Sequence, residues 1–195
     1  MIAAIDNTFL TVLLNPSAAP RPNPSTKVPI AHCRERIEAL VDSLSRNGAT
    51  LIVPAPALAE ALSATQAIES YFEGLKQYSA IELAPFDGRA AYEFGRIIRT
   101  ATNDGDKRSG QTGDWQHVKM DRMIVAIAVS RSATIFYSDD LRQKKFASLA
   151  GLEVKSTWDL DLPPEYAQHN LFAESPWLLQ KKPRKSTDSE KPPAL

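Results

Sequence analysis

Residues 134–141 read TIFYSDDL, a short apolar run that ends in a serine and two adjacent aspartates. A run of this length with β-branched and aromatic residues is typical of a buried strand. Strand-like and helix-like patterns alternate on both sides of it, which predicts an α/β fold with a central parallel sheet. Ligands bind outside the carboxyl ends of the strands in such sheets, so Asp139 and Asp140 are expected at the ligand-binding edge.

The alternation can be followed through the first 155 residues. Five strands are expected at residues 2–5, 50–53, 81–83, 133–137 and 152–154. Apolar residues at helical spacing predict helices between them, at residues 8–14, from 32 to the glycine at 48, around 55–62, and at 65–76, 87–101, 119–130 and 141–150. The segment 119–130 is apolar on nearly all sides, which indicates a helix packed within the core.

Length and composition favour one domain. We expect the 195-residue chain to hold a domain at residues 1–160, with a proline-rich insert at 15–29 and a C-terminal extension at 161–195. The extension is rich in lysine, proline and serine after about residue 180, a composition typical of disorder.

The charge balance narrows the class of partner. Acidic and basic residues number 23 each, which argues against a protein that coats nucleic acid through a high net positive charge. The single cysteine cannot form an internal disulfide, and no run approaches the roughly 18 apolar residues of a membrane span. We therefore expect a cytoplasmic protein without a membrane partner.

Acidic residues stand at four informative places. Asp6 closes the first expected strand, and the Asp139–Asp140 pair closes the fourth, so these acids converge if the two strands are neighbours. Glu60 lies among alanines and leucines, and Asp121 opens the most hydrophobic helix.

Each acid also has a purely structural interpretation. Asp6 and one residue of the Asp139–Asp140 pair could cap the helices that follow them. Glu60 could face solvent, and Asp121 could pair with Lys119 or Arg122.

Together, the acids favour a metal site. Two like charges about 4 Å apart repel by roughly 4 kcal/mol at an effective dielectric constant near 20, so a carboxylate cluster needs protons or cations. Carboxylate oxygens suit Mg²⁺ or Mn²⁺. The three histidines lack the spacing of zinc ligands, and we interpret them as surface or loop residues.

At this point the chain resembles the PIN-domain nucleases, including the VapC-type toxins of bacterial toxin–antitoxin pairs. The resemblance covers roughly residues 1–155. It rests on IDNTFL (5–10), the helix, strand and proline turn of residues 36–62, the strand and helix of 81–97, VKMDRMIVAIA (118–128) and TIFYSDD (134–140). It implies an α/β/α sandwich with a central parallel sheet and Mg²⁺- or Mn²⁺-dependent cleavage of single-stranded RNA.

The resemblance also implies roles for individual residues. Asp6, Asp121 and Asp140 would hold the metal, with Glu60 as a further ligand or as the group that orients the attacking water. A separate set would support the acids by hydrogen bonds, and three cations are candidate RNA contacts. The supporting set is Thr8, Ser138 and Asp139, and the cations are Lys119, Arg122 and Arg142.

Within the aspartate pair, the spacing from Ser138 favours Asp140 as the functional acid. Asp139 is then the better candidate for the helix cap or a supporting role. The family further implies an RNA substrate, single-stranded or structured, a small antitoxin protein and a homodimer. The insert 15–29 and the basic tail are departures from the compact toxins.

Two other functions fit parts of the sequence. One is a catalytically weak PIN-like module that binds protein or RNA. The long insert and the tail favour this alternative. The other is a phosphatase with an aspartate nucleophile. It fits poorly, because Asp6 is followed by Asn7 and Thr8 with no second aspartate two positions on.

Overall fold

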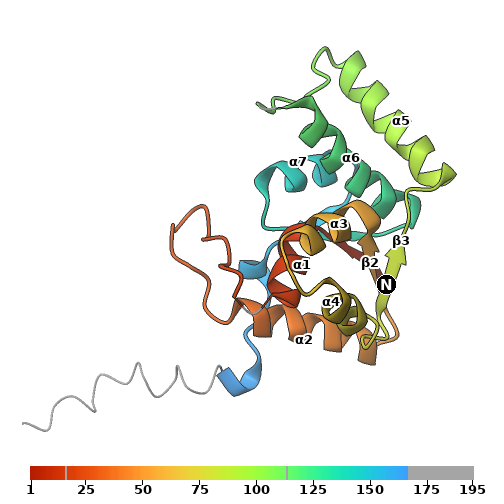
Figure 1. The fold of residues 1–195 in the computed structure, drawn as a ribbon. Helices are drawn as coiled ribbons and strands as arrows, with labels where there is room; N and C mark the ends of the chain where they lie inside the picture. Colours follow the sequence, from red (N-terminus) through yellow and green to blue (C-terminus); the bar gives the residue numbers. More distant parts are fainter. Residues whose placement is uncertain (16, 113, 167–195) are drawn as a thin grey trace, which may run out of the picture. The chain divides into compact units, whose positions relative to one another are not determined.

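A five-stranded parallel sheet forms the centre of the protein (Figure 1). The computed structural model describes residues 1–15, 17–112 and 114–166. The strand order is β3-β2-β1-β4-β5, and every neighbouring pair runs parallel. The strands are β1 (Ile2–Ile5), β2 (Thr50–Pro54), β3 (Ile81–Ala84), β4 (Ile135–Tyr137) and β5 (Glu153–Lys155).

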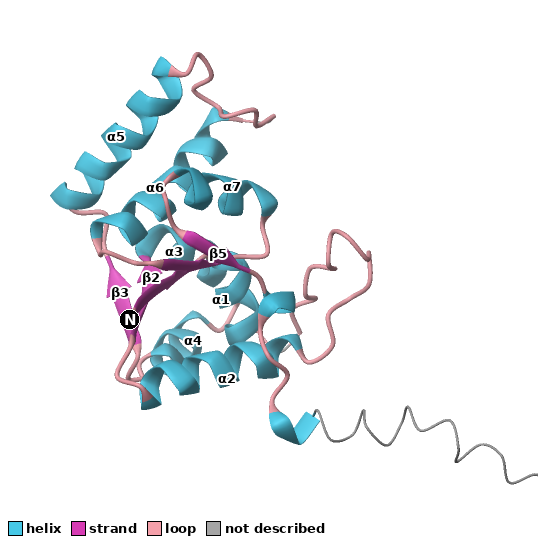
Figure 2. Ribbon diagram, turned by 180° about the vertical axis from the view of Figure 1, so that it is seen from behind, coloured by secondary structure: helices cyan, strands magenta, loops and turns pink. Residues whose placement is uncertain are grey.

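Helices cover both faces of this sheet (Figure 2). They are α1 (Asn7–Leu14), α2 (Cys33–Arg46), α3 (Ala55–Ser63), α4 (Ile68–Leu75), α5 (Gly88–Asn103), α6 (Trp115–Ser130) and α7 (Leu141–Leu149), with a 3-10 turn, η1, at Thr157–Asp159. Helices α1, α2 and α4 lie on one face, and α6 and α7 lie on the other, with α5 packed on α6. Helix α3 contacts both α1 and α6. The predicted α/β/α arrangement is confirmed.

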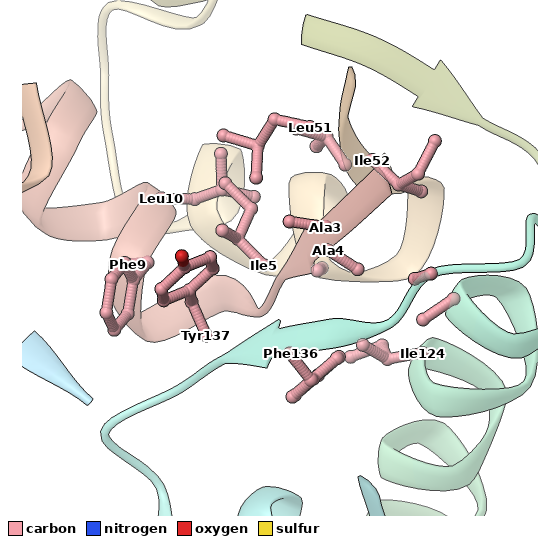
Figure 3. Close-up of a cluster of buried hydrophobic side chains, with 14 of the residues drawn as sticks. Ala3, Ala4, Ile5, Phe9, Leu10, Leu51, Ile52, Ile124, Phe136 and Tyr137 are labelled. Carbon is pink, nitrogen blue, oxygen red and sulfur yellow. The ribbon is translucent and has the colours of Figure 1, made fainter. Parts of the chain in front are cut away.

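The core forms because strand residues alternate between the two faces. Phe136 and Tyr137 are consecutive in β4 and both are buried. Figure 3 shows Phe136 beside Ile124 of α6 and Tyr137 beside Phe9 of α1, on opposite sides of the strand. The Phe9 and Tyr137 ring centroids are 5.7 Å apart. One strand therefore joins both helical layers.

Helix α6 packs within the core, as predicted, but it begins four residues earlier than expected. The side chain of Asp114 caps it by accepting the backbone N–H of Gln116. The first turn holds a single buried residue, Val118, so the hydrophobic pattern did not mark this start. The extra turn places His117 on the same helix as Asp121, one turn before it.

Residues 1–163 form one compact unit and residues 164–195 fall in a second one. All the elements described above belong to the first unit. The disorder predicted after about residue 180 lies outside the described residues. None of the helices in the described part of the chain has the length and apolar character needed to cross a membrane.

Candidate active site

Four acidic side chains from four elements meet at the carboxyl edge of the sheet. Strands β1 and β4 are neighbours, with Ile5 paired to Tyr137, so the residues that follow them lie side by side. The backbone N–H of Asp6 donates to the carbonyl oxygen of Tyr137 at 3.2 Å. Helix α6 carries Asp121 and α3 carries Glu60, and the charges of Glu60 and Asp140 both act on Asp121. The convergence predicted for the two strand ends is confirmed.

Asp6 is fully buried and surrounded by hydrogen-bond donors. Its Oδ1 accepts from the Thr8 backbone N–H at 2.9 Å, from the Thr8 hydroxyl at 2.6 Å and from the Phe9 N–H at 3.2 Å. Its Oδ2 accepts from the Ser138 hydroxyl at 2.5 Å. Burial raises the pKa of Asp6 to about 6, although the hydrogen bonds from Ser138 and Thr8 oppose the shift. Asp6 also caps α1, so its structural interpretation is confirmed.

Two hydroxyl groups connect the ends of β1 and β4. The Thr8 hydroxyl donates to Asp6 and accepts the backbone N–H of Asp139 at 3.0 Å. The Ser138 hydroxyl donates to Asp6 and accepts the backbone N–H of Asp140 at 3.0 Å. Each hydroxyl therefore fixes one backbone position of the aspartate pair relative to Asp6.

Asp139 is buried and accepts hydrogen bonds from η1, the 3-10 turn that follows β5. Its Oδ1 accepts the Thr157 backbone N–H at 2.8 Å, and its Oδ2 accepts the Thr157 hydroxyl at 2.6 Å. Burial raises the pKa of Asp139, and these two hydrogen bonds oppose the shift. The side chain thus ties η1 to the sheet.

Asp140, not Asp139, caps α7. Its Oδ1 accepts the backbone N–H groups of Arg142 at 2.8 Å and Gln143 at 3.3 Å. Of the two roles expected for Asp139, the helix cap is therefore wrong, and the supporting role stays a prediction. With Asp139 and Asp140 adjacent, the sequence does not show which carboxylate turns back onto the helix.

The other oxygen of Asp140 binds an arginine from the proline-rich insert. Arg21 Nη1 lies 2.7 Å from Asp140 Oδ2. Burial acts to raise the pKa of Asp140, but the Arg21 hydrogen bond and the capped N–H groups outweigh it and hold the pKa below its usual range. Asp140 is therefore a carboxylate at neutral pH.

Asp121 is buried on α6 and faces α7. Its Oδ1 accepts from Gln143 Nε2 at 3.0 Å, and its Oδ2 lies 2.8 Å from Arg142 Nε. That second contact lacks hydrogen-bond geometry, so Asp121 Oδ2 is a buried oxygen without a donor in the described part of the chain. The predicted structural alternative, pairing with Lys119 or Arg122, is wrong, because Arg142 is the partner.

The acids lie close enough for their charges to shift one another's pKa values. Burial raises the pKa of Asp121 to about 6, Arg142 opposes this, and the charges of Asp140 and Glu60 add to it. Partial burial likewise raises the pKa of Glu60, against the influence of His117 and Arg142. The carboxylate of Glu60 has no hydrogen bond or ion pair among the described residues.

The donor chemistry fits a hard divalent cation. Carboxylates dominate the edge, and Asp121 Oδ2 is a buried oxygen that has Arg142 as its ion-pair partner but no hydrogen bond among the described residues. No three acidic, histidine or cysteine side chains within residues 1–15, 17–112 and 114–166 form a ready-made metal cage. Two of the acids are neutralised by Arg21 and Arg142 instead. A cation that binds here must displace these arginines.

The candidate RNA contacts behave differently from one another. Arg142 is one-third exposed and lies at the acids. Lys119 is half-buried. Arg122 is fully buried, donates from Nη2 to the Ser109 hydroxyl at 2.9 Å, and lies over the ring of Phe146 at 4.9 Å. The prediction that Arg122 contacts RNA is therefore wrong, because its guanidinium group is inaccessible.

Sequence reasoning missed two side chains at this edge. His117, interpreted as a surface or loop residue, is exposed but lies on α6 close enough to Glu60 to influence its pKa. Its spacing of four residues from Asp121 was the available signal. Arg21 gave no signal, because 119 residues separate it from Asp140.

Known proteins resemble this chain in structure but not in sequence. No protein-family model matches the sequence, and no curated protein sequence matches it. Solved structures do match, and they identify a PIN-like α/β fold. VapBC2 from Rickettsia felis, bound to a DNA fragment from its promoter, matches with a TM-score of 0.53 and 16% identity. DNA-bound VapBC from Salmonella typhimurium matches with a TM-score of 0.51 and 17% identity. Each match covers 80% of this chain and 98% of the other.

Proposed function

We propose that this protein is an endoribonuclease that depends on Mg²⁺ or Mn²⁺ and cleaves single-stranded RNA. The observation that carries the proposal is the placement of Asp6, Glu60, Asp121 and Asp140 at one sheet edge, where Asp121 Oδ2 has Arg142 as its ion-pair partner but no hydrogen bond among the described residues. The likeness to VapBC structures supports the fold on which this site stands. A divalent cation, when bound, supplies charge to hold a phosphate oxygen and to activate a water.

The chain's own residues have distinct tasks in this proposal. Asp6, Asp121 and Asp140 would hold the cation, and Thr8 and Ser138 orient Asp6 through their hydroxyl groups. Glu60 would act as a further ligand, or would orient the attacking water and accept its proton. Its raised pKa favours proton acceptance over that of an ordinary glutamate.

The biological role proposed is that of a toxin in a toxin–antitoxin pair. This rests on the likeness to VapBC complexes and on the resemblance of the sequence blocks. The partners that follow are a small antitoxin protein and a second copy of this chain. Copurification of a small protein with the chain from its own host tests this role separately from the chemistry.

Cleavage of a labelled single-stranded RNA in the presence of Mn²⁺ tests the chemistry. We expect the parent protein to cleave, and Asp6→Asn and Asp121→Asn to lose at least about 100-fold in rate, since each removes a charged ligand. Asp104→Asn is the matched control, because Asp104 is an exposed acid at the end of α5. Equal rates for the parent and Asp121→Asn would refute the proposal.

A catalytically weak binding module is the second candidate. Its support is that the chain's own Arg21 and Arg142 already neutralise Asp140 and Asp121. Such a module would bind RNA or protein without a need for metal. RNA binding by the parent without any metal-dependent cleavage would favour it.

A further inference from the structure

Within the proline-rich insert, residues 17–29 form a preorganised arm beside the acids. Figure 1 shows it as the orange-red loop that extends beyond α1. At its tip the backbone N–H of Asn23 donates to the Val28 carbonyl at 3.1 Å, and that of Lys27 donates to the Asn23 carbonyl at 2.8 Å. The Asn23 side chain also accepts the Ser25 N–H at 2.9 Å. Prolines and this closed turn limit the entropy that the arm would lose on binding a ligand.

Among the described residues of the arm, Arg21 forms the ion pair with the acidic site. Arg21 is 53% exposed and Asp140 is 15% exposed, so their ion pair is open to solvent on the arginine side. Ion pairs of this kind are weak, because water competes for the guanidinium group. Asp140 Oδ1 is already used in the helix cap, so Oδ2, the oxygen that Arg21 binds, is the one left for a metal.

The arm also walls a pocket next to the site. This pocket has a volume of about 490 Å³ and lies between the arm, the loop before α6 and the start of α7. Its charged lining consists of Arg21, Lys27, Arg142, Asp139 and Asp140. Arg21 also lines a smaller pocket of about 160 Å³ beside Thr8 and Asp139. Three cations therefore flank the acids on the side of the arm.

We propose that the arm is a phosphate-binding wall for the RNA substrate, in which Arg21 exchanges Asp140 for a backbone phosphate of the bound strand. The inference rests on the proposed function, and it assigns a substrate-positioning role to the insert. A divalent cation on Asp140 Oδ2 removes the partner of Arg21 while the arm keeps that guanidinium at the pocket. The planar guanidinium binds phosphate oxygens in pairs, which a flexible lysine does not. Lys27 and Arg142 extend the same cationic wall.

RNA binding in a background that does not cleave tests the arm. The probe is a fluorescent single-stranded RNA oligonucleotide titrated with Asp121→Asn protein and with the Asp121→Asn, Arg21→Ala double variant. Each titration is run at several salt concentrations, in Mn²⁺ high enough to saturate the weakened metal site of this background. We expect the loss of Arg21 to weaken binding about tenfold. The slope of log affinity against log salt should fall by about 0.7, the value for one phosphate contact on a single strand.

The matched control is Arg96→Ala in the same background. Arg96 is 64% exposed and pairs with Glu93 at 3.0 Å, so it resembles Arg21 in exposure and in pairing but lies on α5. We expect no change in affinity or in salt slope. Arg21→Lys should recover the slope but only part of the affinity, because lysine keeps the charge and loses the paired geometry.

The outcomes separate this inference from the proposed function. Unchanged or tighter RNA binding without Arg21 would overturn the inference and leave Arg21 as a simple block on Asp140. Arg21-dependent binding by a parent protein that does not cleave RNA would support the arm and refute the nuclease. Failure of the Mn²⁺-saturated Asp121→Asn protein to bind the RNA would overturn the inference. The proposed nuclease activity is tested separately, by RNA cleavage with the parent protein.

Discussion

The two halves of the acidic edge are stabilised in different ways. On one half, Asp6 and Asp139 receive hydrogen bonds from neutral hydroxyl and N–H donors, chiefly those of Thr8, Ser138 and Thr157. On the other half, Asp121 and Asp140 face guanidinium groups. Neutral donors fix the position of a carboxylate and leave its charge in place, whereas an arginine cancels the charge.

This difference separates a rigid half from an exchangeable half. The hydroxyl network is buried, and breaking it leaves polar atoms unsatisfied. The arginines come from a half-exposed arm and from the first turn of α7, and their charge is what a divalent cation would replace. We infer that the first half holds the geometry of the site and the second half exchanges its cations when metal and RNA bind.

The largest expected effect is a dependence of stability on pH. Burial raises the pKa of Asp6 and of Asp121 from 3.8 to about 6, so each folded carboxyl group holds its proton more tightly than the unfolded chain does. The free energy of unfolding should therefore fall as pH rises from about 4 to about 6. The free energy of unfolding should fall by at most about 3 kcal/mol for each group.

Urea unfolding in EDTA between pH 4.5 and 7.5 measures this effect. Asp140 contributes with the opposite sign because its pKa is lowered, so the informative quantity is the difference between the parent and Asp121→Asn. That difference should shift in favour of the variant as pH rises. A difference that stays constant with pH would contradict the electrostatic description of Asp121.

A smaller effect is expected from the hydroxyl-bonded half. Thr157→Val removes the hydroxyl donor of buried Asp139 Oδ2, which should cost about 1–3 kcal/mol of unfolding free energy. Thr157→Ser is the matched control, since it keeps the donor. Mn²⁺ affinity should change less than twofold in both variants. A large loss of metal affinity in Thr157→Val with little loss of stability would mean that the two halves are not separate.

The fold was largely predictable because its signals are local. Apolar runs ended by acids marked β1 and β4, and helical spacing marked α2 and α5. The acids at the strand ends converge because parallel strands place their carboxyl ends at one edge. The start of α6 was not predicted because its first turn holds a single buried residue, and the Asp114 cap is the signal that marks it.

The details of the site depend on contacts between distant residues, which local patterns do not record. The Arg21–Asp140 pair joins positions 119 residues apart. Arg122 looks like a surface cation in the sequence, yet α6 buries it over the ring of Phe146. Asp140 rather than Asp139 caps α7, and the carboxylate of Asp139 instead accepts hydrogen bonds from Thr157.

The most direct test of the central claim is a calorimetric titration with Mn²⁺ at pH 7.5, where Asp6 and Asp121 are ionised. The parent protein should bind Mn²⁺, and Asp121→Asn should bind at least about tenfold more weakly, because the neutral amide removes one negative charge and one oxygen ligand from the edge. Asp104→Asn should match the parent. An absence of binding heat in the parent, or equal affinities for the parent and Asp121→Asn, would contradict the account of an acidic edge built for a divalent cation.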